Sequence, residues 1–140
     1  MMSFFDSLKD TFRNVADVVQ DKLTQKQVDA FIKGGIGAAL AGDGELSSAE
    51  IAEIAKTIST TLTNVSVKEA LDKINAFLPE LKGYDTNLRI LLIGDEVGRE
   101  IKNENVRSAL KKMCTRIVQS DGIVSDAEGE YIKLLLDAMK

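Results

Sequence analysis

The chain has 140 residues, 44% of them apolar, and a formal net charge of −4 from 18 basic and 22 acidic residues. These values indicate one globular domain over residues 1–140 that needs no disulfide or metal to support its core, and they disfavour a nucleic-acid partner. The absence of histidine excludes Ser-His-Asp and Cys-His catalysis and His-ligated metals, and the single cysteine, Cys114, excludes a disulfide within the chain and a thiolate zinc cage.

The N-terminal residues have neither the basic region nor the long apolar region of a signal peptide. The longest weakly polar stretch, residues 36–41, is far shorter than the roughly 20 residues that a membrane span needs. The lone cysteine is typical of a reducing compartment. The sequence therefore predicts a cytoplasmic protein without membrane insertion.

Apolar residues recur at spacings of three and four through most of the chain, which predicts amphipathic helices. We expect an all-α fold, a bundle of seven helices: from Ser3 to about Val19, and then over about 25–41, 48–62, 67–83, 85–102, 104–119 and 125–139. Residues 88–94 (LRILLIG) could also form a buried strand, but no second strand is available to pair with it, so a helix is favoured.

The fourth helix is predicted to start with a capping box formed by Ser66 and Glu69. Its inward stripe is expected to hold Val67, Leu71, Ile74 and Leu78, and Pro79 and Gly83 are expected near its end as helix breakers. Within the second helix, residues 34–37 (GGIG) resemble a phosphate loop. No Gly-Lys-Ser/Thr follows, so we interpret these glycines as a close crossing of two helices.

The sequence contains an internal repeat at an offset of 78 residues. Residues 43–50 (DGELSSAE) and 121–128 (DGIVSDAE) are identical at five of eight positions. Apolar residues of the flanking helices match at the same offset. The repeat predicts two helix–loop–helix units, over about 25–62 and 103–139, related by a pseudo-two-fold axis.

Each repeated segment has two interpretations. Ser47 with Glu50, and Ser125 with Glu128, match the capping box, which needs no ligand. The order Asp-Gly-x5-Glu also matches the second half of an EF-hand loop. The candidate metal ligands are then Asp43, Glu45, Glu50, Asp121, Ile123 and Glu128, with Glu45 and Ile123 contributing carbonyl oxygens. Because the first-half ligands are missing, any site is expected to bind calcium or another divalent cation with low affinity.

The start Ser3-Phe4-Phe5-Asp6 and the two Asp-Gly loops, each between an apolar helix and an acidic capped helix, make the chain resemble the TerB family of tellurite-resistance proteins. The resemblance implies a seven-helix pseudo-two-fold bundle and a cytoplasmic, non-enzymatic role in a bacterial stress response. It also implies association with the membrane-embedded protein TerC, and a metal or partner site that falls here on Asp43, Glu50, Asp121 and Glu128.

The main functional hypothesis is a binding or scaffold module that uses the acidic loops. Catalysis by the pair Asp121 and Glu128 is disfavoured, since nothing places a substrate pocket beside them. The alternative is a metal-free interaction domain, either co-chaperone-like or bound to a membrane surface through the first helix, although the acidic polar face of that helix favours packing in the core. Lys111, Lys112 and Arg116 form a modest basic cluster, and Cys114 is expected to be buried.

Overall fold

In the computed structural model, the described residues are 23–42, 46–118, 133 and 137. Every regular element in these ranges is a helix: α2 (Gln25–Gly42), α3 (Ser48–Thr61), α4 (Val67–Gly83), α5 (Thr86–Glu100) and α6 (Glu104–Val118). The predicted all-α class and the five corresponding helices are confirmed, and residues 88–94 are helical. The predicted first and seventh helices lie outside the described ranges, except that Lys133 and Asp137 are helical and exposed.

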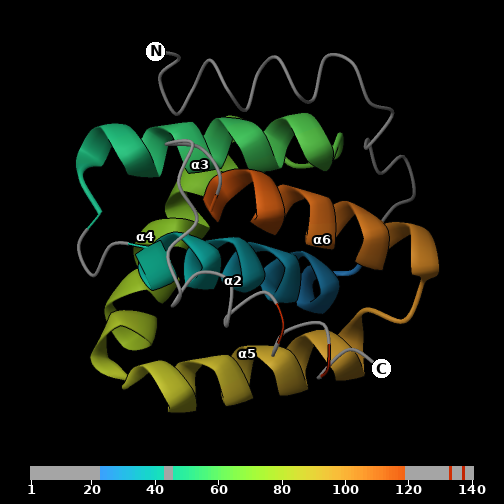
Figure 1. The fold of residues 1–140 in the computed structure, drawn as a ribbon. Coiled ribbons are helices and arrows are strands. Elements are labelled where there is room, and N and C mark those ends of the chain that lie inside the picture. The colour runs from blue at the N-terminus through green and yellow to red at the C-terminus, as the bar shows by residue number, and fades with distance from the viewer. Residues whose placement is uncertain (1–22, 43–45, 119–132, 134–136, 138–140) are drawn as a thin grey trace.

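Helix α2 is the centre of the bundle and contacts α3, α4, α5 and α6. In Figure 1 it runs through the middle, with α3 and α6 on one side and α5 on the other. Its side chains Phe31, Ile32 and Ile36 are fully buried. Complete burial of such side chains is worth about 1.5–3 kcal/mol each, so α2 supplies a large share of the hydrophobic stabilisation.

Gly34, the first glycine of the 34–37 stretch in α2, lies at a close helix crossing of the kind predicted. A Cβ atom on Gly34 would come within 3.0 Å of Leu110 Cδ1 on α6. One turn further along α6, the Cys114 thiol donates to the Gly34 carbonyl oxygen at 3.4 Å, and both Leu110 and Cys114 are fully buried. The missing side chain therefore lets α6 approach the backbone of α2.

Local hydrogen bonds fix where the helices start. At the start of α2, the Thr24 Oγ1 accepts from the Gln27 N–H and the Gln27 Oε1 accepts from the Thr24 N–H, which is a reciprocal capping box. The Asp85 Oδ1 accepts from the Leu88 N–H at 2.8 Å and caps α5. Asn103 Oδ1 accepts from the Asn105 N–H at 2.8 Å before α6. Each cap satisfies a backbone donor that the helix itself cannot pair.

Two arginines tie the end of one helix to the start of the next. Buried Arg89 on α5 donates from Nε to the Leu81 carbonyl oxygen at 2.8 Å and from Nη2 to the Tyr84 carbonyl oxygen at 3.1 Å. Arg107 on α6 donates in the same way to the Ile101 and Gly98 carbonyl oxygens. A cation at a helix C-terminus pairs the last carbonyls and complements the helix dipole, so both corners are fixed.

Two predictions for α4 differ from the structure. Val67 is 41% exposed and so lies off the predicted inward stripe. The other predicted positions hold, since Ile74 is buried and Leu71 and Leu78 pack partly buried against the core; Ala70 and Leu81 are buried as well. The Glu69 N–H donates to Ser66 Oγ, so Ser66 is the N-cap without the predicted return bond from Glu69. Helix α4 ends at Gly83 with Pro79 in its last turns, as predicted, and the Leu81 carbonyl oxygen near this end accepts from Arg89 Nε and from the Tyr84 N–H.

Candidate functional site

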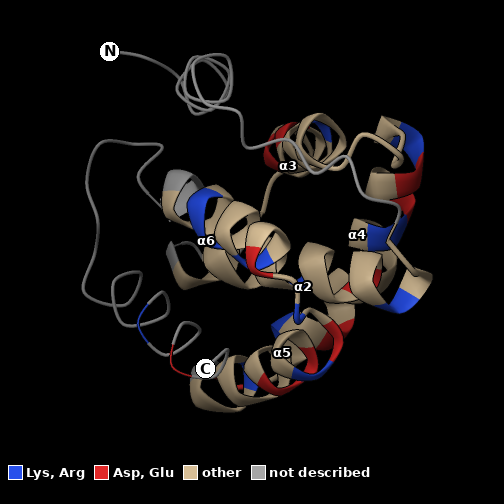
Figure 2. Cartoon of the chain, turned by 90° about the vertical axis from the view of Figure 1, so that its right-hand side faces the viewer, with Lys and Arg blue, Asp and Glu red and all other residues tan. Residues whose placement is uncertain are grey.

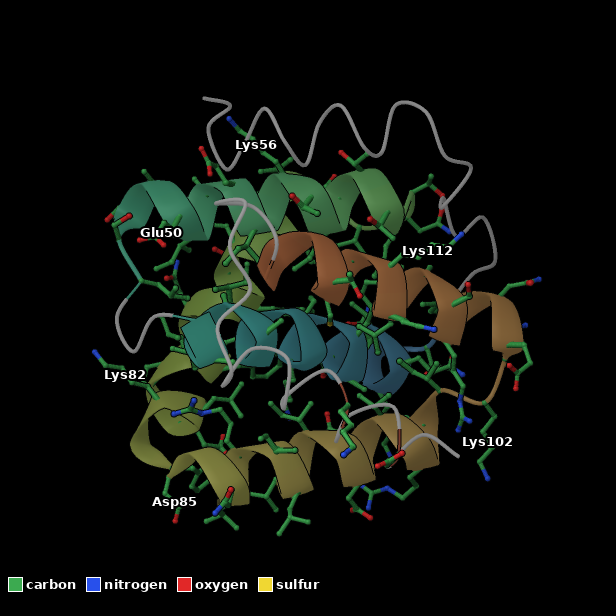
Figure 3. The ribbon with its side chains drawn as sticks, in the orientation of Figure 1. Glu50, Lys56, Lys82, Asp85, Lys102 and Lys112 are labelled. Atoms are coloured by element: carbon green, nitrogen blue, oxygen red, sulfur yellow. The ribbon has the colours of Figure 1, made fainter. Side chains whose placement is uncertain are left out.

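Of the six predicted metal ligands, the structure describes one, Glu50. Asp43, Glu45, Asp121, Ile123 and Glu128 lie outside the described ranges. Helix α2 ends at Gly42 and Ser47 is the N-cap of α3, so the first repeated segment lies between two described helices in the sequence. Figure 3 shows Glu50 at the start of α3.

Glu50 takes part in a reciprocal capping box with Ser47. The Glu50 N–H donates to Ser47 Oγ at 3.2 Å, and the Ser47 N–H donates to Glu50 Oε1 at 3.1 Å. Two of the four backbone donors that lack an intrahelical partner at the start of α3 are therefore satisfied, as the sequence predicts. The acidic side chain also lies in the first turn of the helix, where the dipole favours negative charge.

The cap limits what Glu50 can do as a ligand. A bidentate calcium ligand uses both carboxylate oxygens, and Oε1 already accepts the Ser47 N–H. Oε2 can bind a cation or a basic side chain while the cap stays in place, whereas bidentate coordination requires the cap bond to lengthen or break. Among the described residues, no group of three or more Asp, Glu, Cys or His side chains is arranged to hold a metal ion.

The thiol of Cys114 is a structural group. The side chain is fully buried in the α2–α6 contact, and burial raises its pKa from an ordinary value of 9.0 to about 12. The thiolate is the nucleophilic form, so a thiol that stays protonated at neutral pH is unreactive. Its expected role as a small buried apolar residue is confirmed.

Two ion pairs connect α2 to its neighbours. Lys33 on α2 donates to Glu96 Oε1 on α5 at 3.0 Å, and Lys73 on α4 donates to Asp29 on α2 at 2.6 Å. The Lys33 ammonium also lies 4.7 Å from the ring centroid of Phe77, a cation–π contact with α4. All four charged side chains are partly buried, so the pairs orient α4 and α5 on α2 and are less screened by salt than surface pairs.

Sequence reasoning missed an exposed apolar surface on α5. Leu88, Leu91 and Leu92 are 41%, 69% and 43% exposed, respectively. They lie on one side of the helix at spacings of three and four, and that side continues with the exposed pair Asp95 and Arg99, whose side chains lie 2.9 Å apart. We call these five residues the outer face of α5. In Figure 1, α5 forms the edge of the bundle and no described helix lies beyond it.

Charges are mixed on the neighbouring surface. In Figure 2, Asp and Glu alternate with Lys and Arg along α4 and α5. In the predicted basic cluster, Lys111 is exposed and Lys112 is partly buried, and the side chain of Arg116 is outside the described part. Within the described ranges, no helix is long and apolar enough to cross a membrane.

Comparison of the chain with protein-family models, curated proteins and solved structures finds no match. The resemblance to the TerB family therefore stays a prediction from the repeated segments.

Proposed function

We propose that this protein is a non-catalytic binding module of a bacterial stress response, of the kind that its resemblance to TerB implies. The carboxylates at the two repeated segments bind a divalent cation or the basic surface of a protein partner. We expect the protein to act in the cytoplasm. Its candidate partner is a TerC-like membrane protein.

The observation that carries the proposal is the position of Glu50. It is the last residue of an Asp-Gly-x5-Glu segment that connects two helices, and the capping box holds its carboxylate at the start of α3. Asp43 and Glu45 precede it in the same segment. The segment is rich in acidic groups, and the carboxylate of Glu50, its last residue, is held in a fixed position. This concentration of negative charge favours attraction of a cation.

The proposed second unit rests on α2 and α6. Val28 and Ile32 of α2 are buried, and so are Val106 and Leu110, which follow them by 78 residues in α6. In the sequence, the described residues of α6 run to Val118, shortly before the second acidic segment, and those of α2 run to Gly42, directly before the first. These equivalences support a pseudo-two-fold repeat with one acidic segment at the end of each apolar helix.

Calcium titration monitored by NMR tests the proposal. We expect the amide signals of Gly44 and Gly122 to shift first, with an affinity near the roughly 10⁻⁴–10⁻³ M class, because each segment lacks the first-half ligands of a full loop. The double variant Asp121→Asn/Glu128→Gln should lose the shifts of the second segment and keep those of the first. Glutamine still serves a capping box, so the variant is expected to fold.

The alternative function is a metal-free interaction domain. It is favoured over a tight calcium site because Glu50 Oε1 already accepts the Ser47 N–H. If millimolar calcium moves neither glycine signal, the metal proposal is wrong. Protein binding is then tested with a TerC-like partner reconstituted in vesicles, using the charge variant Asp43→Asn/Glu50→Gln. Undiminished binding by that variant, or no binding by the parent protein, would contradict a role for the first acidic segment.

A further inference from the structure

We infer that the outer face of α5 is a self-association surface, on which a second copy of this chain docks its own α5 in an antiparallel arrangement. This inference is independent of the acidic segments. It rests on three exposed leucines and on the distribution of charge along the helix.

The leucines form a contiguous patch and are not scattered. Exposed apolar side chains that occur singly are normal on protein surfaces, but neighbouring ones on a single helix face mark a contact site. Leu88, Leu91 and Leu92 are adjacent on α5, and Leu91 is the most exposed large apolar side chain of the described residues, at 69%. The opposite side of α5 is already used, since Ile90, Ile93 and Val97 are buried.

The charges of α5 are self-complementary when the helix is reversed. Acidic Asp85 is at its N-terminal end and basic Arg99 is in its last turn. The two residues are 14 positions apart, about 21 Å along a helix, and Leu92 is midway between them. A two-fold axis through Leu92 therefore places Arg99 of each copy beside Asp85 of the other, and it places Leu88 and Leu91 of one copy on the opposite side of the axis from those of the other copy.

Both charged groups are available for that contact. Asp85 is exposed, and its cap uses one oxygen of a carboxylate that can accept several hydrogen bonds. The present partner of Arg99 is Asp95, one turn away on the same exposed face, in a class of pair that contributes little to stability. In Figure 3, Asp85 and Lys102 lie at opposite ends of α5. Antiparallel packing also opposes the two helix dipoles favourably.

The size of the surface predicts weak association. Three leucines and two charged residues from one helix give an interface at or below the low end of the range for stable complexes, about 1,200 Å² in total. We therefore expect a monomer at micromolar concentration and a growing fraction of dimer towards millimolar concentration.

Sedimentation equilibrium over that concentration range tests the inference. Leu91→Glu should weaken dimerisation at least about tenfold, because it introduces two like charges beside the axis. Arg99→Glu should weaken it as well, because it places a carboxylate beside Asp85 of the other copy. Two variants on α4 serve as matched controls. Val67→Glu changes an apolar residue that is as exposed as Leu88, and Lys68→Glu makes the same change of charge as Arg99→Glu. Both control variants should dimerise like the parent.

Cross-linking tests the register directly. Leu92→Cys should give covalent dimers with a short bifunctional maleimide, since two copies of residue 92 meet at the axis, and Val67→Cys should not. The native thiol does not interfere, because Cys114 is buried. The inference is overturned if the parent protein stays monomeric at millimolar concentration, if Leu91→Glu dimerises like the parent, or if Val67→Cys cross-links as well as Leu92→Cys.

Discussion

The start of α3 and the outer face of α5 are both exposed, and they differ in how their side chains are satisfied. At the start of α3, Ser47 and Glu50 pair with each other's backbone N–H groups, so the fold itself explains why these residues are present. On α5, Leu88, Leu91 and Leu92 are exposed, and no contact within residues 23–42 and 46–118 accounts for them. The hydrogen bonds of a polar motif can thus be explained by local structure alone, whereas an apolar face that is exposed to water indicates a partner.

The largest expected effect separates the two sides of α5. Ile93 is buried against the core, so Ile93→Ala should lower the free energy of unfolding by about 2–5 kcal/mol through lost burial and the cavity left behind. Leu91→Ala on the outer face should change it by less than about 0.5 kcal/mol. Urea denaturation at low protein concentration measures both, and similar losses would show that the outer face is part of the core.

The buried thiol of Cys114 should make the free energy of unfolding depend on pH. The pKa of Cys114 is raised to about 12 in the folded protein from an ordinary 9.0, so the folded state holds a proton that the unfolded state releases above pH 9. This stabilisation is complete below pH 9, and it is lost as the pH rises towards 12, by about 1.4 kcal/mol per pH unit. Denaturation curves at pH 9 and 10.5 measure it. Cys114→Ala should show a smaller decrease, and an equal decrease would exclude the thiol as the cause.

The corner before α5 tests what holds the outer face in place. Arg89→Met removes two hydrogen bonds from a buried guanidinium to the carbonyl oxygens of Leu81 and Tyr84, and their loss should cost about 1–3 kcal/mol. Arg99→Met, in an exposed ion pair on the same helix, should cost less than about 0.5 kcal/mol in the monomer. Thermal unfolding compares the two, and equal losses would contradict the role of Arg89.

The smallest effect separates the cap of α3 from its charge. Ser47→Ala removes the side-chain acceptor of the Glu50 N–H and should destabilise the protein by about 0.5–2 kcal/mol. Glu50→Gln keeps a side-chain oxygen for the Ser47 N–H and should stay within about 0.5 kcal/mol of the parent. Calcium affinity should show the reverse order, with Glu50→Gln losing more. An unchanged denaturation midpoint for Ser47→Ala would refute the capping assignment.

Much of the fold could be predicted because helices carry local signals. Periodicity and caps identify α2 to α6, and Gly34 indicates the close approach of α6 that the structure contains. The end of α4 was predicted, but not how it is held, since the Leu81 and Tyr84 carbonyl oxygens accept hydrogen bonds from Arg89, a residue of the next helix. Such a contact between two helices leaves no local pattern in the sequence.

There is a physical reason why the sequence does not show which face of α5 is exposed. Apolar residues occupy nearly the whole circumference of residues 88–93, so the pattern does not say which side faces the core. Contact with α2, including the Lys33–Glu96 pair, buries Ile90 and Ile93 and leaves the leucines outside.

At the candidate site, the sequence predicts the capping box of α3 because both partners lie within four residues.

The most direct test of the account is one set of amide NMR spectra recorded at low and high protein concentration, each with and without calcium. Raising the concentration should shift the signals of Leu88, Leu92 and Arg99 and leave those of Ser47 and Glu50 unchanged. Adding calcium should shift Gly44 and Glu50 and leave α5 unchanged. Shifts at α3 on concentration, shifts at α5 on adding calcium, or no response to either change would contradict the assignment of separate binding roles to these two surfaces.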